Sequence, residues 1–183
     1  QTRYSPKMDV IKDLISRGGL GKVVEFCGRG KEDRRGGGED LWVLGTHIFD
    51  LMRLFGGNAL WCFARVTQDG RPVTADHVKE GNEGIGALAG DSVVAMFGME
   101  SGVTAYFSSH RACAGRPTRF GLTIKGSDGL LQTYTGPLPQ VKLLEDSAWS
   151  PGRTGSTWTD VSTAGPGKPE PLKTEGLHGG NIW

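Results

Sequence analysis

The chain has 183 residues, and 21 Lys and Arg residues against 20 Asp and Glu residues give a formal net charge of +1. This balance gives no general electrostatic reason to expect a nucleic acid or an anionic membrane as partner. The 30 glycines accompany 37% hydrophobic residues, which indicates a folded protein with many loops rather than a disordered chain.

The three cysteines are odd in number and widely spaced, at Cys27, Cys62 and Cys113. Without a Cys-x-x-Cys pair they argue against a disulfide framework and a zinc site, and they favour a reducing, cytoplasmic location. No run of residues approaches the roughly 18 apolar residues of a membrane-spanning helix. The sequence therefore predicts a soluble protein.

The first third of the chain predicts two helices on either side of a short strand. Ser5-Pro6 favours a helix start, because serine can cap free amides and proline is tolerated in the first turn. Residues 22–27 have the β-branched character of a strand, and residues 28–38 form a polar, glycine-rich loop. A second helix begins at residue 39 or 40 and ends near residue 55.

The pattern then changes to short strands with turn residues between them. Residues 69–90 are a polar insertion, and the last twenty residues have the composition of a tail. The predicted helices and strands together indicate an α+β fold with a large, mainly antiparallel sheet and a few helices. The expected strands cover residues 59–67, 92–99, 103–109, 120–125, 130–135 and 141–144, with one more at most near 158–161.

Two glycine patterns are similar to a dinucleotide-binding loop. Residues 84–89 match Gly-x-Gly-x-x-Ala, but the preceding segment is polar and no helix follows. Residues 28–33 follow a strand, yet Asp33 stands at the third glycine position and no helix opens there. Neither pattern predicts a phosphate-binding site.

Gly36, Gly37 and Gly38 precede the second predicted helix. A helix N-terminus attracts anions, but the acidic Glu39 and Asp40 already occupy that positive end. We favour a flexible entry with an aspartate cap; the other interpretation is a loop that a substrate can approach closely.

His47 is the strongest candidate for chemistry. It lies beside the apolar stripe of the second helix, on a flank that also carries Asp40 and Asp50. An isolated histidine there is more often a packed residue than a functional one. Asp50 could orient the imidazole or pair with Arg53. No spacing of His, Cys or carboxylate residues predicts a metal site.

Several segments agree in order and spacing with one known family. The central segment is 36–51, in which three glycines precede Leu-Gly-Thr-His-Ile-Phe-Asp-Leu. The others are Arg3-Tyr4-Ser5-Pro6, Lys12-Asp13-Leu14-Ile15, Gly19-Leu20-Gly21 and Thr123-Ile124-Lys125-Gly126-Ser127-Asp128-Gly129. Together they resemble the Gfo/Idh/MocA family, the glucose-fructose oxidoreductase and inositol dehydrogenase group, over the chain to about residue 144.

The resemblance implies a two-domain plan, in which a Rossmann domain and a Glu-Lys-Pro segment precede a sheet domain. This chain would begin just after that segment. Residues 1–21 would be the end of the nucleotide-binding domain, residues 22–165 the substrate-binding and oligomerisation domain, and residues 166–183 a loop or tail. The family's closing helix would begin where residues 179–183 end, so we expect truncation at both ends.

The resemblance also implies roles for single residues. The family's matching histidine takes or gives the proton of a sugar or polyol hydroxyl during hydride transfer, which assigns His47 as the catalytic residue. The family usually carries an aspartate four residues earlier; here that residue is Val43, and Asp40 lies one turn further back. We expect Lys31, Arg35, Asp40 and Asp50 to bind substrate, and Arg3 and Tyr4 to bind the cofactor. Solvated surface charges are the alternative for the basic residues.

These expectations describe the substrate-binding portion of an NAD(P)-dependent oxidoreductase acting on a sugar or polyol. NAD or NADP is expected in the full-length relative and no cofactor for this chain alone, which would be inactive. A homo-oligomer through the open sheet face is also expected. The alternative is a catalytically silent sheet domain that binds a carbohydrate or a partner, and Val43 favours it.

Overall fold

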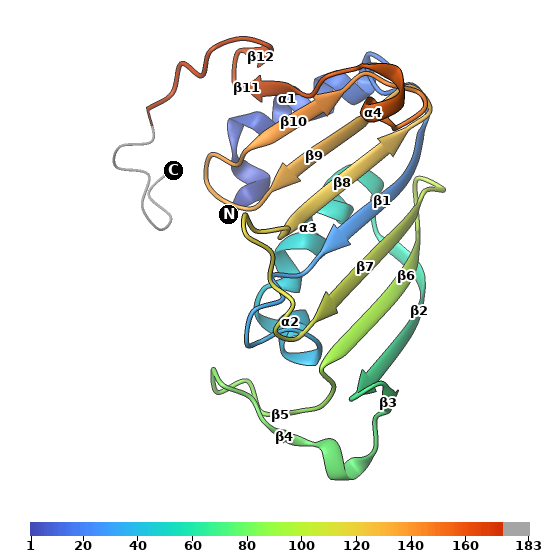
Figure 1. Ribbon diagram of the computed structural model, residues 1–183, viewed down its shortest axis with the longest axis vertical. Helices are drawn as coiled ribbons and strands as arrows, with labels where there is room; N and C mark the ends of the chain where they lie inside the picture. Colours follow the sequence, from blue (N-terminus) through green and yellow to red (C-terminus); the bar gives the residue numbers. More distant parts are fainter. Residues whose placement is uncertain (174–183) are drawn as a thin grey trace. The chain divides into compact units, whose positions relative to one another are not determined.

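Two units make up the chain in the computed structural model, which describes residues 1–173 (Figure 1). The first unit contains Gln1–Phe26 and the chain from Leu122 on, and the second contains Cys27–Gly121. Among the described residues, no helix combines the length and the apolar character that a membrane crossing requires. The α+β class and the mainly antiparallel strand pairing expected from the sequence are confirmed.

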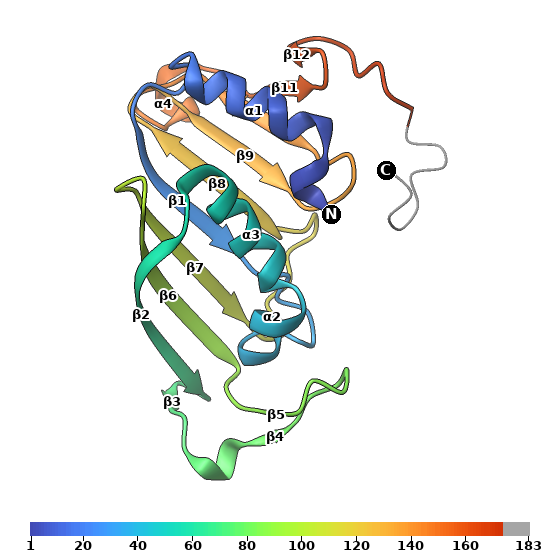
Figure 2. The same ribbon diagram turned by 180° about the vertical axis from the view of Figure 1, so that it is seen from behind.

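The first unit places helix α1 (Pro6–Ser16) on one face of a sheet (Figure 2). Its strand order is β12-β11-β10-β9-β8, followed by the first half of β1 (Val23–Arg29). Met8 and Ile11 of the helix are fully buried, because they share the apolar stripe expected from helical spacing. The other elements are η1 (Thr2–Tyr4), β8 (Gly121–Gly126), β9 (Leu130–Tyr134), β10 (Val141–Leu144), α4 (Pro151–Thr154), β11 (Thr159–Ser162) and β12 (Gly165–Pro166).

The second unit continues from the second half of β1 in the order β7-β6-β2-β3. A tight hairpin joins β6 to β7, with Ser92 opposite His110 and Gly98 opposite Thr104. A separate pair, β4 with β5, lies in the polar insertion. The elements are α2 (Gly38–Val43), α3 (Gly45–Gly56), β2 (Ala59–Gln68), β3 (Arg71–Pro72), η2 (Ala75–His77), β4 (Lys79–Glu80), β5 (Ala87–Leu88), β6 (Ser92–Met99) and β7 (Thr104–His110).

Helix α3 covers one face of the second unit's sheet (Figure 2). Phe49 packs against Phe97 and Phe107, at ring-centroid distances of 5.6 and 4.7 Å. Ile48 and Met52 lie directly over Gly28, where an added Cβ would be 2.4 and 2.6 Å from their side chains. This glycine is therefore fixed by helix packing and not by a ligand.

The opposite face of the same sheet is apolar and exposed. Because side chains alternate along a strand, the pairs Phe63–Met96 and Met96–Tyr106 share the face that α3 does not cover. Trp61, Phe63 and Tyr106 expose 49%, 71% and 40% of their surface. A patch of this kind marks an interaction surface in soluble proteins.

Two expectations about local structure are wrong. The single helix from residue 39 or 40 to 55 is two helices, α2 and α3, with a break at Leu44 (φ −119°). Ser5 stands at the expected N-cap of α1, but its side chain makes no cap hydrogen bond. The domain boundaries at residues 21 and 165 stay predictions. Residues 174–183, which include part of the predicted tail and the expected start of a closing helix, lie outside the described residues.

Candidate functional site

The three consecutive glycines lie in a packed turn of the second unit. Gly36, Gly37 and Gly38 are all buried. An added Cβ would lie 2.4 Å from the backbone of Arg111 at Gly36, and 2.2 Å from the carbonyl oxygen of Ala89 at Gly38. The expectation of a flexible entry is therefore wrong, because each glycine allows two backbone segments to approach closely.

The amides of this turn are occupied within the protein. Gly37 donates to the Ser109 hydroxyl at 3.0 Å, and Gly38 donates to the carbonyl of Gly90 at 3.1 Å. The N-cap of α2 is Gly37 (φ +83°), and no side chain caps it, so the expected aspartate cap is also wrong. Neither amide offers a free donor to an anion.

Asp40 is fully buried in the first turn of α2. Its Oδ2 accepts a hydrogen bond from the Ser109 hydroxyl at 2.5 Å and one from the Glu32 amide at 3.4 Å. Burial raises the pKa of the Asp40 carboxyl, and the bond from Ser109 opposes that rise. Gly30 makes room for this arrangement, since a Cβ there would lie 2.1 Å from Oδ2.

His47 lies in the first turn of α3 and is half-buried. Its amide donates to the carbonyl of Leu44 at 3.1 Å, and the Leu44 amide donates to the carbonyl of Asp40 at 3.0 Å. Asp40 thus accepts a hydrogen bond from Ser109 of β7 with its side chain and one from Leu44 with its backbone carbonyl. Leu44 is the residue at which α2 ends and α3 begins.

The other predicted substrate residues also lie in the second unit. Arg35 pairs with Asp33 at 2.7 Å and with Glu83 at 2.5 Å, and its guanidinium lowers the pKa of Asp33 to about 2. Lys31 is exposed, with its Nζ 3.6 Å from Asp33. Asp50 is half-buried on α3, one turn after His47.

Arg53, the other residue considered as a partner for Asp50, donates to the side chain of Asn58 at 2.8 Å. Arg3 and Tyr4, the predicted cofactor residues, lie in η1 of the first unit, where Tyr4 is 62% exposed. The site-residue assignments all stay predictions. What the structure adds is that the catalytic and substrate candidates share one unit.

Sequence reasoning missed a buried carboxylate beside this site. Glu32 is 1% exposed and accepts hydrogen bonds from Arg29 at 3.2 Å, from Arg119 at 2.9 Å and from the amide of His110 at 3.2 Å. In sequence it is one charge within a polar loop, next to Asp33. Only its positive φ of 60° and its distant partners distinguish it, and neither is visible in the sequence.

Neither of the two glycine patterns forms a dinucleotide-binding loop in the structure. Gly28 lies beneath α3 and Gly30 lies beside Asp40. Gly84 and Gly86, both with positive φ, lie between the paired strands β4 and β5, so no helix follows them. Within residues 1–173, no group of three or more His, Cys, Asp or Glu side chains is arranged to hold a metal ion.

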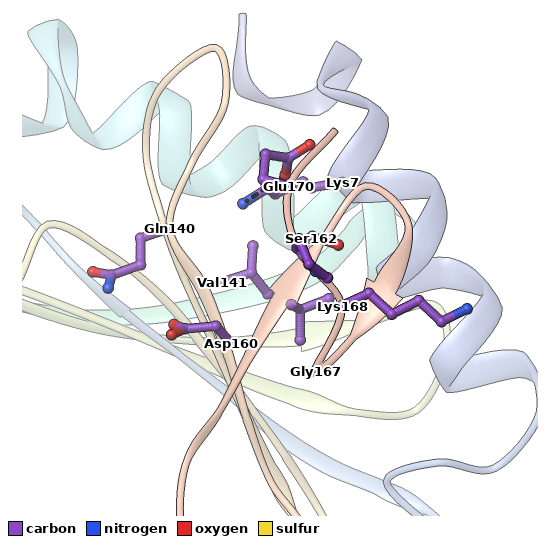
Figure 3. Close-up of a pocket in the computed structure, with 10 residues that line it drawn as sticks. Lys7, Gln140, Val141, Asp160, Ser162, Gly167, Lys168 and Glu170 are labelled. Atoms are coloured by element: carbon purple, nitrogen blue, oxygen red, sulfur yellow. Dashed lines mark ion pairs between the residues drawn. The ribbon is translucent and has the colours of Figure 1, made fainter. Parts of the chain in front are cut away.

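The first unit contains a separate open pocket of about 500 Å³ (Figure 3). Lys7, whose side chain is 10% exposed, pairs there with Glu170 at 3.4 Å, and Lys168 and Asp160 lie on its rim. Glu170 also accepts a hydrogen bond from the Thr163 hydroxyl at 2.5 Å. The Lys7–Glu170 pair thus links the segment after β12 to α1.

A comparison with family models gives a match to the GFO/IDH/MocA C-terminal domain over residues 8–132. No curated protein is significantly similar to the chain in sequence. Solved structures with a similar fold include a levoglucosan dehydrogenase in complex with NADH and L-sorbose, with a TM-score of 0.61 and 17% identity. The match covers 98% of this chain and 52% of the dehydrogenase chain.

Two further structures have the same fold. A 3-ketoreductase from Actinomadura kijaniata in complex with TDP-benzene and NADP has a TM-score of 0.58 and 18% identity, over 86% of this chain and 44% of its own. An NAD binding oxidoreductase from Klebsiella pneumoniae has a TM-score of 0.58 and 16% identity, over 87% of this chain and 44% of the oxidoreductase chain. The chain thus spans about half the length of these structures.

Proposed function

Because the chain belongs to the GFO/IDH/MocA family, we propose that it is the substrate-binding portion of an NAD(P)-dependent oxidoreductase acting on a sugar or polyol. The observation that carries this proposal is the half-buried His47 in the first turn of α3, the helix that directly follows α2 and its buried Asp40–Ser109 hydrogen bond. The levoglucosan dehydrogenase structures, one with levoglucosan and one with L-sorbose, support the substrate class.

His47 has the chemistry that such a reaction needs. An alcohol must lose its hydroxyl proton as hydride leaves, and a neutral imidazole accepts a proton near physiological pH. In this proposal His47 takes that proton in oxidation and returns it in reduction. The Asp40 side chain is buried and bonded to Ser109, and Val43 stands where the family usually has an aspartate, so in this proposal His47 acts without a carboxylate at that position.

Neither glycine pattern among the described residues forms a phosphate-binding turn, which supports the proposal that this chain alone binds no dinucleotide. In this proposal NAD or NADP is the hydride carrier of the full-length protein, and Arg3 and Tyr4 contribute to binding it. We expect this chain alone to bind neither NAD(H) nor NADP(H) in a calorimetric titration. Micromolar affinity would contradict that expectation.

The open face of the second unit's sheet supports a homo-oligomer. Its exposed aromatic side chains include Trp61, Phe63 and Tyr106. Oligomers of identical chains commonly bury such a face against a second copy. A cytoplasmic location and the absence of nucleic-acid and membrane partners complete the proposal.

The second candidate is a sheet domain that binds a carbohydrate or a protein partner without redox chemistry. Val43 favours it, because an apolar side chain cannot assist proton transfer at the position where the family usually has an aspartate. This candidate predicts sugar binding that does not depend on His47.

The deciding experiment measures nicotinamide reduction by the protein, expressed with any coding sequence that flanks the chain, against levoglucosan and a panel of sugars and polyols. We expect His47→Ala to lower turnover about 100-fold or more while cofactor affinity is unchanged. His77→Ala is the matched control, since His77 only bonds Thr74 in the insertion. Unchanged turnover in His47→Ala would remove the catalytic role, and sugar binding without turnover would favour the second candidate.

A further inference from the structure

Two strained loops lie against each other at one edge of the second unit. The first loop (residues 30–37) follows β1, whose last residue is Arg29, and the second (residues 111–119) follows β7. Glu32 (φ 60°) and Ala112 (φ 58°) are both in the left-handed region that residues with side chains rarely adopt. The Ala112 amide donates to the carbonyl of Asp33 at 3.1 Å. Strain held by mutual contacts of this kind is typical of ligand-binding sites.

The buried carboxylate of Glu32 holds two arginines at this edge. Arg29 Nη1 lies 3.2 Å from Glu32 Oε1, and Arg119 Nη2 lies 2.9 Å from Oε2. The carboxylate is 1% exposed, whereas the side chains of Arg29 and Arg119 are 39% and 52% exposed. Arg119 also donates to the carbonyl of Cys113. Each guanidinium is therefore held by Glu32, while its side chain stays partly exposed to solvent.

The two loops concentrate positive charge. Residues 29–35 and 111–119 contain seven basic and two acidic residues, a net charge of +5, while the whole chain has a net charge of +1. Asp33 and Glu83 neutralise Arg35. Arg34 and Arg116 are exposed on the same loops. A local field of this sign attracts anions.

Neutralising Glu32 does not require both arginines. One guanidinium balances the charge of one carboxylate. The second guanidinium therefore leaves an excess positive charge on the partly exposed side chains of Arg29 and Arg119. Paired, rigid guanidinium forks match the geometry of carboxylate and phosphate groups. The arrangement thus suits an anion approaching from solvent.

We propose that Arg29 and Arg119, held by Glu32, bind the carboxylate or phosphate group of the substrate. This inference rests on the proposed function and narrows its substrate class to anionic derivatives of sugars or polyols, which are sugar acids or sugar phosphates. Glu32 is a positioning residue that directs the two guanidinium groups.

The test is isothermal titration calorimetry of the protein with gluconate, with a glucose phosphate and with glucose. We expect at least one anion to bind about tenfold more tightly than glucose, with an affinity that falls as salt is added. Binding of gluconate alone identifies a sugar acid, binding of the phosphate alone identifies a sugar phosphate, and binding of both identifies the shared anion chemistry. Equal affinity for glucose and both anions, or no anion binding, would overturn the inference.

Substitutions separate a ligand site from a structural ion pair. Arg119→Lys keeps a charge that can pair with Glu32 but loses the planar fork, so we expect about tenfold weaker anion binding at an unchanged urea midpoint. Arg153→Lys, on α4 in the first unit, should change nothing. Arg116→Gln lowers the local charge without touching Glu32 and should weaken binding by a smaller factor, even if Arg119→Lys fails to fold.

The anion site and the catalytic role of His47 can be contradicted independently, by different measurements. The preference for an anion over glucose should persist in His47→Ala, because His47 lies on α3 and not on either loop. Turnover that does not depend on His47 would overturn the catalytic role alone. If Arg119→Lys and Arg116→Gln both bind anions as tightly as the unaltered protein, the anion site alone would be overturned.

Discussion

The Ser109 hydroxyl donates a hydrogen bond of 2.5 Å to the carboxylate of Asp40, and both residues are fully buried. The two are 69 positions apart in sequence. The same hydroxyl accepts the amide of Gly37 at 3.0 Å, so one side chain connects β7, the glycine turn and α2. These bonds hold the first turn of α2 against β7.

We predict that Ser109→Ala lowers the free energy of unfolding by about 1–3 kcal/mol, because a buried carboxylate loses a donor. Urea denaturation measures the change. Ser108→Ala is the control, since the neighbouring side chain points to the other face of the strand. Equal losses in both variants would show that the Asp40 bond contributes nothing specific.

Gly30→Ala should lower the free energy of unfolding by about 2–3 kcal/mol, since the new Cβ would lie 2.1 Å from Asp40 Oδ2 and 2.7 Å from Ser109 Cβ. Thermal denaturation followed by circular dichroism gives the measurement. In Gly152→Ala the added methyl group meets nothing within 4 Å, so this variant should keep its stability. A stable Gly30→Ala would mean that the Asp40 pocket is loosely packed.

The ion pair between Asp33 and Arg35 should make the free energy of unfolding depend on pH in the acidic range. The pKa of Asp33 is about 2 in the folded protein, below its ordinary value of 3.8, so its contribution is present above pH 3.8 and is lost as pH falls toward 2. Asp33→Asn should therefore lower the free energy of unfolding by up to about 2 kcal/mol at neutral pH and by little near pH 2.

Urea midpoints measured from pH 2 to 7 test this dependence. The exposed Asp76, in η2, provides the control as Asp76→Asn, which should leave the midpoint unchanged. A loss in Asp33→Asn that is constant across the pH range would point to packing and not to charge.

The apolar sheet face gives a prediction about assembly. If the chain forms the proposed homo-oligomer through this face, Phe63→Glu should convert it to a monomer, because a charge would be buried at the contact in place of an aromatic ring. Size-exclusion chromatography with light scattering measures the mass. Val78→Glu, at an exposed apolar residue between η2 and β4, should leave the mass unchanged. If the unaltered protein is itself a monomer, this face does not join identical chains.

Local patterns predicted most of the elements. The strands at residues 92–99 and 141–144 were predicted with the bounds observed, since period-two burial and turn residues are local properties. The break at Leu44 was missed. Gly45 lies there because a Cβ would be 2.9 Å from the carbonyl of Asp40 and 3.2 Å from Phe107, and the second contact comes from a distant strand.

The sequence by itself determined the α+β class, the order of the longer strands, and the segments that resemble the family. The tertiary structure decided that the three glycines are packed, that Asp40 bonds Ser109, and that Glu32 joins Arg29 to Arg119, which is 87 positions away. Hydrophobic periodicity specifies which face of an element is buried. It does not specify the partner of a buried charge, because that partner is selected by the approach of segments far apart in the chain.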